Sequence, residues 1–241
     1  MPNKRRTLGQ HMLVDHKVLA KIVDAAGIDK SETVCEVGTG QGILTAELCR
    51  RAQWIISFEI DRELFRNAQE QLKFNNLELA NADLFKTAEL HFDVFVSNLP
   101  YSRSRDAFEW LAVRKFSRAI VMVQEEFADK LTATPGDKKY RAISVLASYC
   151  FKIEKLFKVQ SKSFEPQPLV ESAVLRIIPI RTITNETIKN VNLLFSKRNK
   201  KASTVAAKAG IQADLGNMRI NQLAADDLVK MAESIQHVRP I

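Results

Sequence analysis

The strongest constraint on the fold is an alternation of short apolar runs with amphipathic stretches up to about residue 180. Apolar runs predict buried strands at residues 33–37, 54–59, 77–80, 92–97, 119–124, 151–159 and 170–178. Apolar residues at helical spacing predict helices between them, for example at 42–51 and 62–74. Continuous apolar strands alternating with helices are typical of a mostly parallel sheet covered on both faces. The last two strands have no helix pattern between them, so they predict an antiparallel hairpin at the edge of a seven-stranded α/β sheet.

Beyond residue 180 the strand pattern stops. Apolar side chains recur at helical spacing over residues 184–195 and 226–235, and no segment there alternates as a strand does. We therefore expect two domains, an α/β domain over residues 1–180 and a small basic helical domain over residues 181–241.

Composition excludes several classes of protein. Hydrophobic residues make up 46% of the 241 residues, which is enough for a sizeable core. No apolar run approaches the roughly 20 residues of a membrane span, and residues 1–7 are basic without the apolar stretch of a secretory signal. The three cysteines form no CxxC pair, which argues against a disulfide framework or a metal site. We expect a cytoplasmic protein with no membrane partner and, since no exposed apolar stripe stands out, a monomer.

The net charge of +8 is concentrated at the two ends of the chain. Basic residues outnumber acidic ones over residues 1–30 and again over 181–241, whereas residues 31–180 are balanced. The densest basic run is Lys197, Arg198, Lys200 and Lys201. Such a distribution suits a polyanionic partner, because phosphates attract basic segments without regard to sequence. The alternative is a solvated surface without a partner.

Three glycines, Gly38, Gly40 and Gly42, follow the first predicted strand. Glycine permits unusual backbone angles and close approach of a ligand, and such a loop is a usual ligand position in α/β sheets. The dinucleotide fingerprint places its third glycine three residues after the second, whereas here the spacing is two. A loop of this kind alone is also compatible with a plain tight turn.

Acidic residues near the ends of strands narrow the choice of ligand. Glu36 precedes the glycines, Glu59 ends the second strand, and Asp83 follows the third. A carboxylate at the position of Glu59 suits both hydroxyls of a ribose, and one at Asp83 suits an adenine amino group. Each acid singly is also an ordinary strand-end carboxylate. Together with the glycine loop they suit an adenosine without a pyrophosphate, for which S-adenosylmethionine is the natural candidate.

The fourth strand ends in Asn98-Leu99-Pro100-Tyr101. Pro100 stops the strand and keeps Leu99 out of the helical region, which leaves the Leu99 carbonyl free to accept from a ligand. The Asn98 side chain adds a second acceptor and Tyr101 adds a flat ring. Two acceptors and a ring suit an exocyclic amine on a planar base. The simpler alternative is a turn that only terminates the strand.

An adenine N6 fits this arrangement chemically. Its lone pair is delocalised into the ring, and two acceptors for its hydrogens draw the nitrogen toward tetrahedral geometry. Positioning and electrostatics then supply most of the barrier reduction, without a strong base. A base inside a helix cannot reach such a pocket, so the target must be unpaired or flipped out.

Taken in order, these motifs resemble the ribosomal RNA small-subunit adenine N6-dimethyltransferase family, KsgA-like and including archaeal-type members. The resemblance runs from Leu8 to about Ile180 and continues weakly beyond. The matching segments are LGQHML at 8–13, EVGTGQGILT at 36–45, FEID at 58–61, NAD at 81–83, NLPY at 98–101, FEPQPLVESAV at 164–174 and LFSKR at 194–198.

The resemblance implies a Rossmann-like S-adenosylmethionine-dependent methyltransferase fold and assigns roles to particular residues. The implied cofactor-binding residues are His11, Leu13, Gly38, Gly40, Gly42, Glu59, Ile60, Asp83 and Asn98. The implied target-site residues are Asn98, Leu99, Pro100, Tyr101 and Phe164, with the rings of Tyr101 and Phe164 on either side of the base. From the residues alone, Phe164 is an exposed aromatic in a proline-rich loop or else a core side chain.

The sequence departs from the family after Tyr101, where it reads Ser102-Arg103-Ser104-Arg105. Arg103 and Arg105 are expected to contact RNA phosphates or to mark an altered substrate, and the basic run 197–201 is expected to contact RNA. The first hypothesis is dimethylation of adenines near the 3′ end of small-subunit ribosomal RNA during ribosome assembly. The alternatives are a large-subunit methyltransferase of the macrolide-resistance type and a non-catalytic RNA-binding assembly or transcription factor.

Overall fold

The structure is a computed structural model that describes residues 11–87, 89–211 and 216–235. The chain divides into two compact units. The first, here called the sheet unit, comprises Met1–Ala107, Phe116–Ala128 and Glu154–Ile178; the second, the helical unit, comprises Phe108–Lys115, Asp129–Ile153 and Pro179–Ile241. The last junction lies beside residue 180, and the two internal segments of the helical unit were not expected from the sequence.

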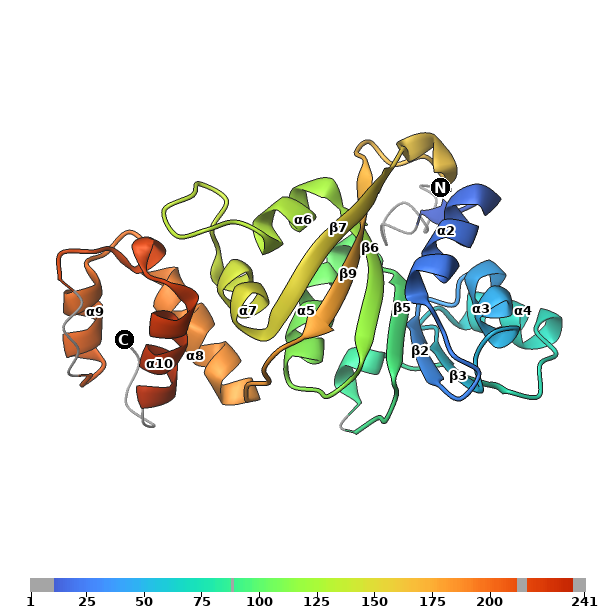
Figure 1. Cartoon of the computed structure of the whole chain (residues 1–241), viewed down its shortest axis with the longest axis horizontal. Helices are drawn as coiled ribbons and strands as arrows, with labels where there is room; N and C mark the ends of the chain where they lie inside the picture. Colours follow the sequence, from blue (N-terminus) through green and yellow to red (C-terminus); the bar gives the residue numbers. More distant parts are fainter. Residues whose placement is uncertain (1–10, 88, 212–215, 236–241) are drawn as a thin grey trace. The chain divides into compact units, whose positions relative to one another are not determined.

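A seven-stranded sheet with the order β4-β3-β2-β5-β6-β9-β7 is the centre of the sheet unit (Figure 1). All seven predicted strands are present. Their bounds are β2 Thr33–Val37, β3 Trp54–Phe58, β4 Leu77–Ala80, β5 Val94–Asn98, β6 Arg118–Gln124, β7 Phe151–Val159 and β9 Ser172–Pro179.

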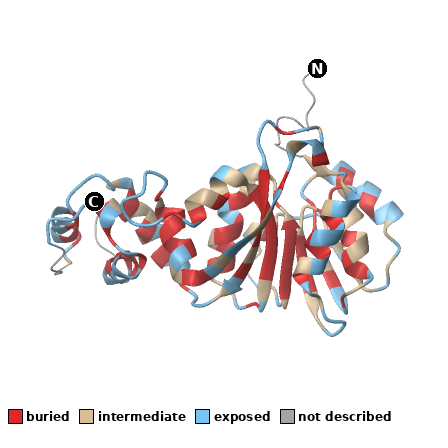
Figure 2. Ribbon diagram, turned by 45° about the horizontal axis from the view of Figure 1, so that its top comes forward, coloured by how far each residue is buried: buried red, intermediate tan, exposed pale blue. Residues whose placement is uncertain are grey.

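The strands from β4 to β6 pair in parallel, and β9 pairs antiparallel with β6. β7 lies beside β9 at the edge, so the predicted mostly parallel α/β fold is confirmed. The side chains of β5 and β6 are buried along most of their length, as Figure 2 shows for the central strands. Burial on both faces explains their continuous apolar sequences.

Strand order reverses between β2 and β5, because β3 and β4 extend the sheet on one side and β6 on the other. A crevice forms outside the carboxyl ends of the strands at such a switch point. The loops after β2, β3, β4 and β5 all emerge at this edge, since these strands are parallel. The topology therefore gathers the glycine loop, Glu59, Asp83 and Asn98 at one place.

The helices of the first part of the chain have clear local causes. Asp15 caps α2 by accepting from the backbone N–H groups of Lys17 and Val18, and Asp61 caps α4 in the same way. α2 was not predicted, although its cap and its final Gly27 are readable signals. The bounds are α2 His16–Ala26, α3 Ile43–Cys49, α4 Arg62–Gln71, α5 Ser104–Ala112 and α6 Glu125–Leu131.

A short second sheet joins distant parts of the sheet unit. β1, Met12–Leu13, pairs antiparallel with β8, Phe164–Glu165. Three 3₁₀ turns also belong to this unit: η1 Leu84–Lys86, η2 Tyr101–Arg103 and η3 Ser161–Ser163. The β1–β8 pair places the segment after residue 10 beside the proline-bearing loop.

The helical unit contains α7 Ala142–Cys150, α8 Asn185–Ser196, α9 Ala202–Lys208, η4 Ile220–Gln222 and α10 Ala225–Ser234. Both helices predicted for this region are present as α8 and α10. Within the unit, buried Tyr140 donates its hydroxyl to the carbonyl of Leu223 at 3.1 Å and meets the ring of Phe195 edge-on. In the described part of the chain, every helix is too short or too polar to cross a membrane.

Candidate active site

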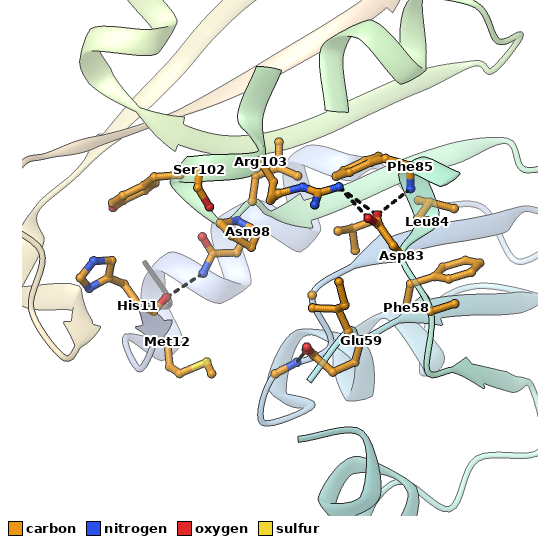
Figure 3. A pocket seen from close by; sticks show the side chains of 18 residues that line it. His11, Met12, Phe58, Glu59, Asp83, Leu84, Phe85, Asn98, Ser102 and Arg103 are labelled. Carbon is orange, nitrogen blue, oxygen red and sulfur yellow. Dashed lines mark hydrogen bonds and ion pairs between the residues drawn. The ribbon is translucent and has the colours of Figure 1, made fainter. Parts of the chain in front are cut away.

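A pocket opens in the sheet unit at the carboxyl ends of β2, β3, β4 and β5 (Figure 3). It brings together most of the predicted site residues, namely His11, Gly38, Gly40, Glu59, Ile60, Asp83, Asn98, Leu99, Pro100, Tyr101 and Arg103. Leu13, Gly42 and Phe164 were predicted for the site and do not line this pocket. Met12, Phe58, Leu84 and Phe85 line it and were not predicted.

The glycine loop after β2 has positive φ at Gly38 (83°), Gly40 (56°) and Gly42 (78°), where a side chain would be strained. A Cβ on Gly40 would lie 3.1 Å from the sulfur of Met12, across the pocket wall. A Cβ on Gly42 would lie 2.9 Å from the side chain of Leu72. Gly42 therefore allows close packing beneath the loop and does not present backbone to the pocket.

Glu59 ties the end of β3 to the glycine loop. Its Oε2 accepts from the N–H of Gly40 at 2.9 Å, and its Oε1 accepts from the N–H of Asp61 at 2.9 Å. The residue is only 3% exposed. Each carboxylate oxygen has two lone pairs, so each keeps one for a ligand. A fixed carboxylate with two free acceptor positions suits a pair of vicinal hydroxyls.

Glu36 lies beneath the loop and does not line the pocket. It is fully buried, and its Oε2 accepts from the hydroxyls of Thr45 and Ser57, both at 2.6 Å. Burial raises the pKa of Glu36 to about 7, and the nearby charge of Glu59 acts in the same direction. Its other oxygen has no partner among the described residues. Glu36 thus supports the loop from below.

Asp83 stands at the opposite wall, 12% exposed at its side chain. It accepts from the N–H of Phe85 at 3.1 Å and from Arg103, whose Nη2 is 2.9 and 3.0 Å from the two carboxylate oxygens (Figure 3). The Nε of Arg103 also lies 3.0 Å from Asp106. Arg103 was expected to contact RNA phosphates, but it lines the pocket and lies between two acids.

Asn98 is the last residue of β5, and a hydrogen bond orients its side-chain amide. Its Nδ2 donates to the backbone carbonyl of His11 at 3.3 Å. That bond turns Nδ2 toward His11 and Oδ1 away from it (Figure 3). The backbone N–H of Leu99 donates to Met122 at 3.2 Å, and the Leu99 side chain is buried. Hydrogen bonds therefore hold both the Asn98 side chain and the Leu99 backbone at the end of β5.

Tyr101 is anchored through its hydroxyl, which lies 2.7 Å from the hydroxyl of buried Ser172 in β9. Burial raises the pKa of Tyr101. The ring lies 5.4 Å from the His11 ring at an angle of 33°. His11 is held by its Nδ1, which donates to the carbonyl of Pro166 at 2.6 Å. Ser172 belongs to the FEPQPLVESAV segment at 164–174, but no local signal marks it as the partner of Tyr101.

Phe164 was expected either as an exposed aromatic of the proline-rich loop or as a core side chain, and the structure shows the second. It is only 4% exposed and packs in a hydrophobic core of the sheet unit, and its place beside a target base stays a prediction. The cause of the burial is its pairing with Leu13 across β1 and β8, which turns both side chains into the core. Side chains alternate along a strand, so the same pairing turns Met12 toward the pocket in place of Leu13.

Apart from Arg103, the predicted RNA-contacting residues do not line the pocket and are mostly exposed. Arg105 is exposed in α5. Arg198, Lys200 and Lys201 are exposed after α8, and Lys197 is half-buried at the end of that helix. Their contact with RNA stays a prediction.

Comparison with known sequences identifies relatives along the whole chain. The family model described as ribosomal RNA adenine dimethylase matches residues 1–237. The chain is 36% identical over 204 residues to a "Probable ribosomal RNA small subunit methyltransferase A" of Pyrococcus abyssi, a match that covers 84% of this chain and 74% of that one. It is 33% identical over 238 residues to the "Ribosomal RNA small subunit methyltransferase A" of Thermotoga maritima, covering 95% and 84% respectively.

Solved structures agree with these sequence matches. A dimethyladenosine transferase from Plasmodium falciparum has a TM-score of 0.75 and 26% identity, over 92% of this chain and 96% of that one. The 23S rRNA methyltransferase ErmE has a TM-score of 0.64 and 25% identity, over 93% and 99%. The fold is therefore that of the Rossmann-like methyltransferases.

Proposed function

Because the chain belongs to the ribosomal RNA adenine dimethylase family, we propose that this methyltransferase transfers methyl groups from S-adenosylmethionine to the N6 atoms of adenines in small-subunit ribosomal RNA. The observation that carries the proposal is the oriented amide of Asn98. Its Nδ2 donates to the His11 carbonyl, which orients the amide, and Asn98 lines the same pocket as the glycine loop and Glu59. An acceptor for an amine therefore stands beside a site for an adenosine.

The pocket residues fit the cofactor. Glu59 offers two free acceptor positions to the ribose hydroxyls, and Asp83 stands where an adenine amino group would donate. Because Gly40 has no Cβ, the side chain of Met12 can lie close to the glycine loop. Exposed Ile60 offers an apolar surface at the rim. When bound, S-adenosylmethionine supplies an electrophilic methyl group next to the target amine.

The chain's own residues activate the target by position. Asn98 Oδ1 and the Leu99 carbonyl accept the two N6 hydrogens and draw the nitrogen lone pair out of the ring plane. Tyr101, fixed by Ser172, offers a ring face to an unpaired base. A fixed acceptor pair costs no reorganisation at the moment of reaction. Phe164 is in the core, so the rings that lie beside Asn98 in the pocket are those of Tyr101 and His11.

The small subunit is favoured as substrate by the relatives, several of which are named small-subunit methyltransferases. The likeness to a 23S rRNA methyltransferase is weaker by TM-score. The intact Glu59, Asp83 and Asn98 count against a non-catalytic factor. We place the reaction on an assembling subunit in the cytoplasm, carried out by a monomer whose basic residues Arg105 and 197–201 hold the RNA backbone.

The test is methyl transfer from labelled S-adenosylmethionine to purified small and large ribosomal subunits that lack adenine dimethylation. The proposal predicts label in small-subunit RNA only. Label confined to large-subunit RNA would favour the resistance-type alternative. Cofactor binding without label in either RNA would favour the assembly-factor alternative.

A further inference from the structure

Arg103 has contacts that an RNA-binding role does not explain. Its guanidinium bridges Asp83 and Asp106 and lies 5.0 Å from the ring centroid of Phe85. All four residues belong to the sheet unit, and three of them line the pocket. Two carboxylates compensate its one positive charge, so little attraction is left for a phosphate. The arginine is therefore better placed to act on Asp83 than on RNA.

The hydrogen bonds of Asp83 show what that action is. A carboxylate oxygen has two lone pairs. Oδ1 accepts from the N–H of Phe85 at 3.1 Å and from Arg103 at 2.9 Å, so it is fully used. Among the described residues, Oδ2 accepts from Arg103 alone, at 3.0 Å. One acceptor position is left on Asp83, on an oxygen that the arginine holds in place.

Resting on the proposed function, we propose that Arg103 is a positioning residue of the adenine subsite. It fixes the Asp83 carboxylate so that the free lone pair of Oδ2 meets the exocyclic amine of the cofactor's adenine. Without Arg103, the carboxylate keeps only the bond from Phe85 to Oδ1 and is free to turn about its terminal torsion, which is broad. The planar, multi-donor guanidinium is suited to fixing a carboxylate in one orientation.

A fixed lone pair also determines which base is accepted. An amino group at position 6 of the purine donates to Oδ2, whereas an oxo group there presents its own lone pairs and is repelled. Arg103 should therefore sharpen the choice of adenine over hypoxanthine. A site that hydrogen-bonds a donor discriminates strongly against an analogue that lacks it.

The experiment measures dissociation constants by calorimetry for S-adenosylhomocysteine and for its 6-oxo analogue, S-inosylhomocysteine. Wild-type protein is expected to prefer the amino form. In Arg103→Met the affinity for the amino form should fall about tenfold, the low end for a hydrogen bond to a charged group. The affinity for the oxo form should change little, so the preference shrinks by about the same factor. Arg103→Lys, which keeps the charge without the fork, should lie between the two.

Two controls separate positioning from a general structural effect. Arg66→Met removes an exposed arginine of α4 that does not line the pocket, and it should leave both dissociation constants unchanged. In an Asp83→Asn background, Arg103→Met should alter the preference no further, because coupled residues are not additive. The salt dependence of RNA binding should be unchanged in Arg103→Met.

An unchanged preference in Arg103→Met would overturn the inference. So would a loss of RNA salt dependence in that variant with both cofactor affinities intact, since Arg103 would then be a phosphate contact. Failure of the wild-type protein to bind S-adenosylhomocysteine would overturn the proposed function itself, and the inference with it.

Discussion

The two ends of the pocket fix their polar groups by different chemistry. At the proposed cofactor end the acceptors are carboxylates, Glu59 and Asp83, and each is held by a backbone N–H group. At the target end the acceptors are neutral, and Asn98 and Tyr101 are held by a carbonyl and a hydroxyl. A charged acceptor suits groups that are bound and do not react. A neutral acceptor suits the reacting amine, because a carboxylate there would also attract the positive sulfonium and stabilise the ground state.

The largest effect is expected from Asn98→Ala, which removes an acceptor used in the transition state. Single-turnover methyl transfer should slow by about 10²–10³-fold, the scale of a lost preorganised group. Calorimetry on the same protein should show cofactor affinity largely preserved. Near-normal turnover would mean that the amine is activated without Asn98.

The free energy of unfolding should depend on pH through Glu36, which is buried beneath the glycine loop. Folding raises the pKa of Glu36 from its ordinary 4.5 to about 7, so the native state binds that proton more tightly than the unfolded chain does. The contribution of Glu36 is therefore fully present below pH 4.5 and is lost as the pH rises toward 7, by roughly 3 kcal/mol in all. Denaturant unfolding at several pH values should show this loss in the wild-type protein and not in Glu36→Gln. Parallel pH curves would contradict it.

Glu59→Ala should weaken cofactor binding and spare the rate of methyl transfer, whereas Asn98→Ala should do the reverse. Cofactor affinity is expected to fall by roughly 1.5–3 kcal/mol, the value of hydrogen bonds to a charged group. Turnover at saturating cofactor should stay near that of the wild-type protein. An unchanged dissociation constant would remove Glu59 from the cofactor site.

A smaller effect is expected where Ser172 holds Tyr101. Ser172→Ala removes one neutral hydrogen bond, worth about 1 kcal/mol, and should weaken methyl transfer several-fold without altering cofactor affinity. Tyr101→Phe breaks the same bond from the other side. The double variant should therefore be little worse than either single one, and fully additive losses would show that the bond does not position the ring.

The smallest effect concerns the helical unit. Changing Lys197 and Arg198 to glutamine should weaken RNA binding and flatten its dependence on salt, since each phosphate contact adds to that slope. The matched control changes Lys30 and Lys73, exposed lysines of the sheet unit. Equal slopes for the two variants would identify the basic run as an ordinary solvated surface.

Local sequence patterns predicted what local physics determines. The strands could be predicted from their apolar runs. The meeting of the glycine loop with the acids at strand ends could be predicted because parallel strands bring their carboxyl ends together. The burial of Phe164 and Leu13 could not be predicted with certainty, because it depends on a two-residue pairing between segments about 150 residues apart in the chain. The contact of Arg103 with Asp83 also comes from tertiary structure, since Asp83 lies 20 residues away. The anchoring of Tyr101 by Ser172 depends on β9 pairing with β6, which no local window shows.

The most direct test of the account is the identity of the methylated nucleoside. Small subunits lacking the modification would be incubated with the protein and S-adenosylmethionine, and their RNA digested and analysed by mass spectrometry. We expect N6,N6-dimethyladenosine, because the acceptors at Asn98 and Leu99 fit an exocyclic amine, and the resemblance to the family places it at adjacent adenines near the 3′ end. Methyl groups on a ring carbon, a ring nitrogen or a ribose hydroxyl would contradict it.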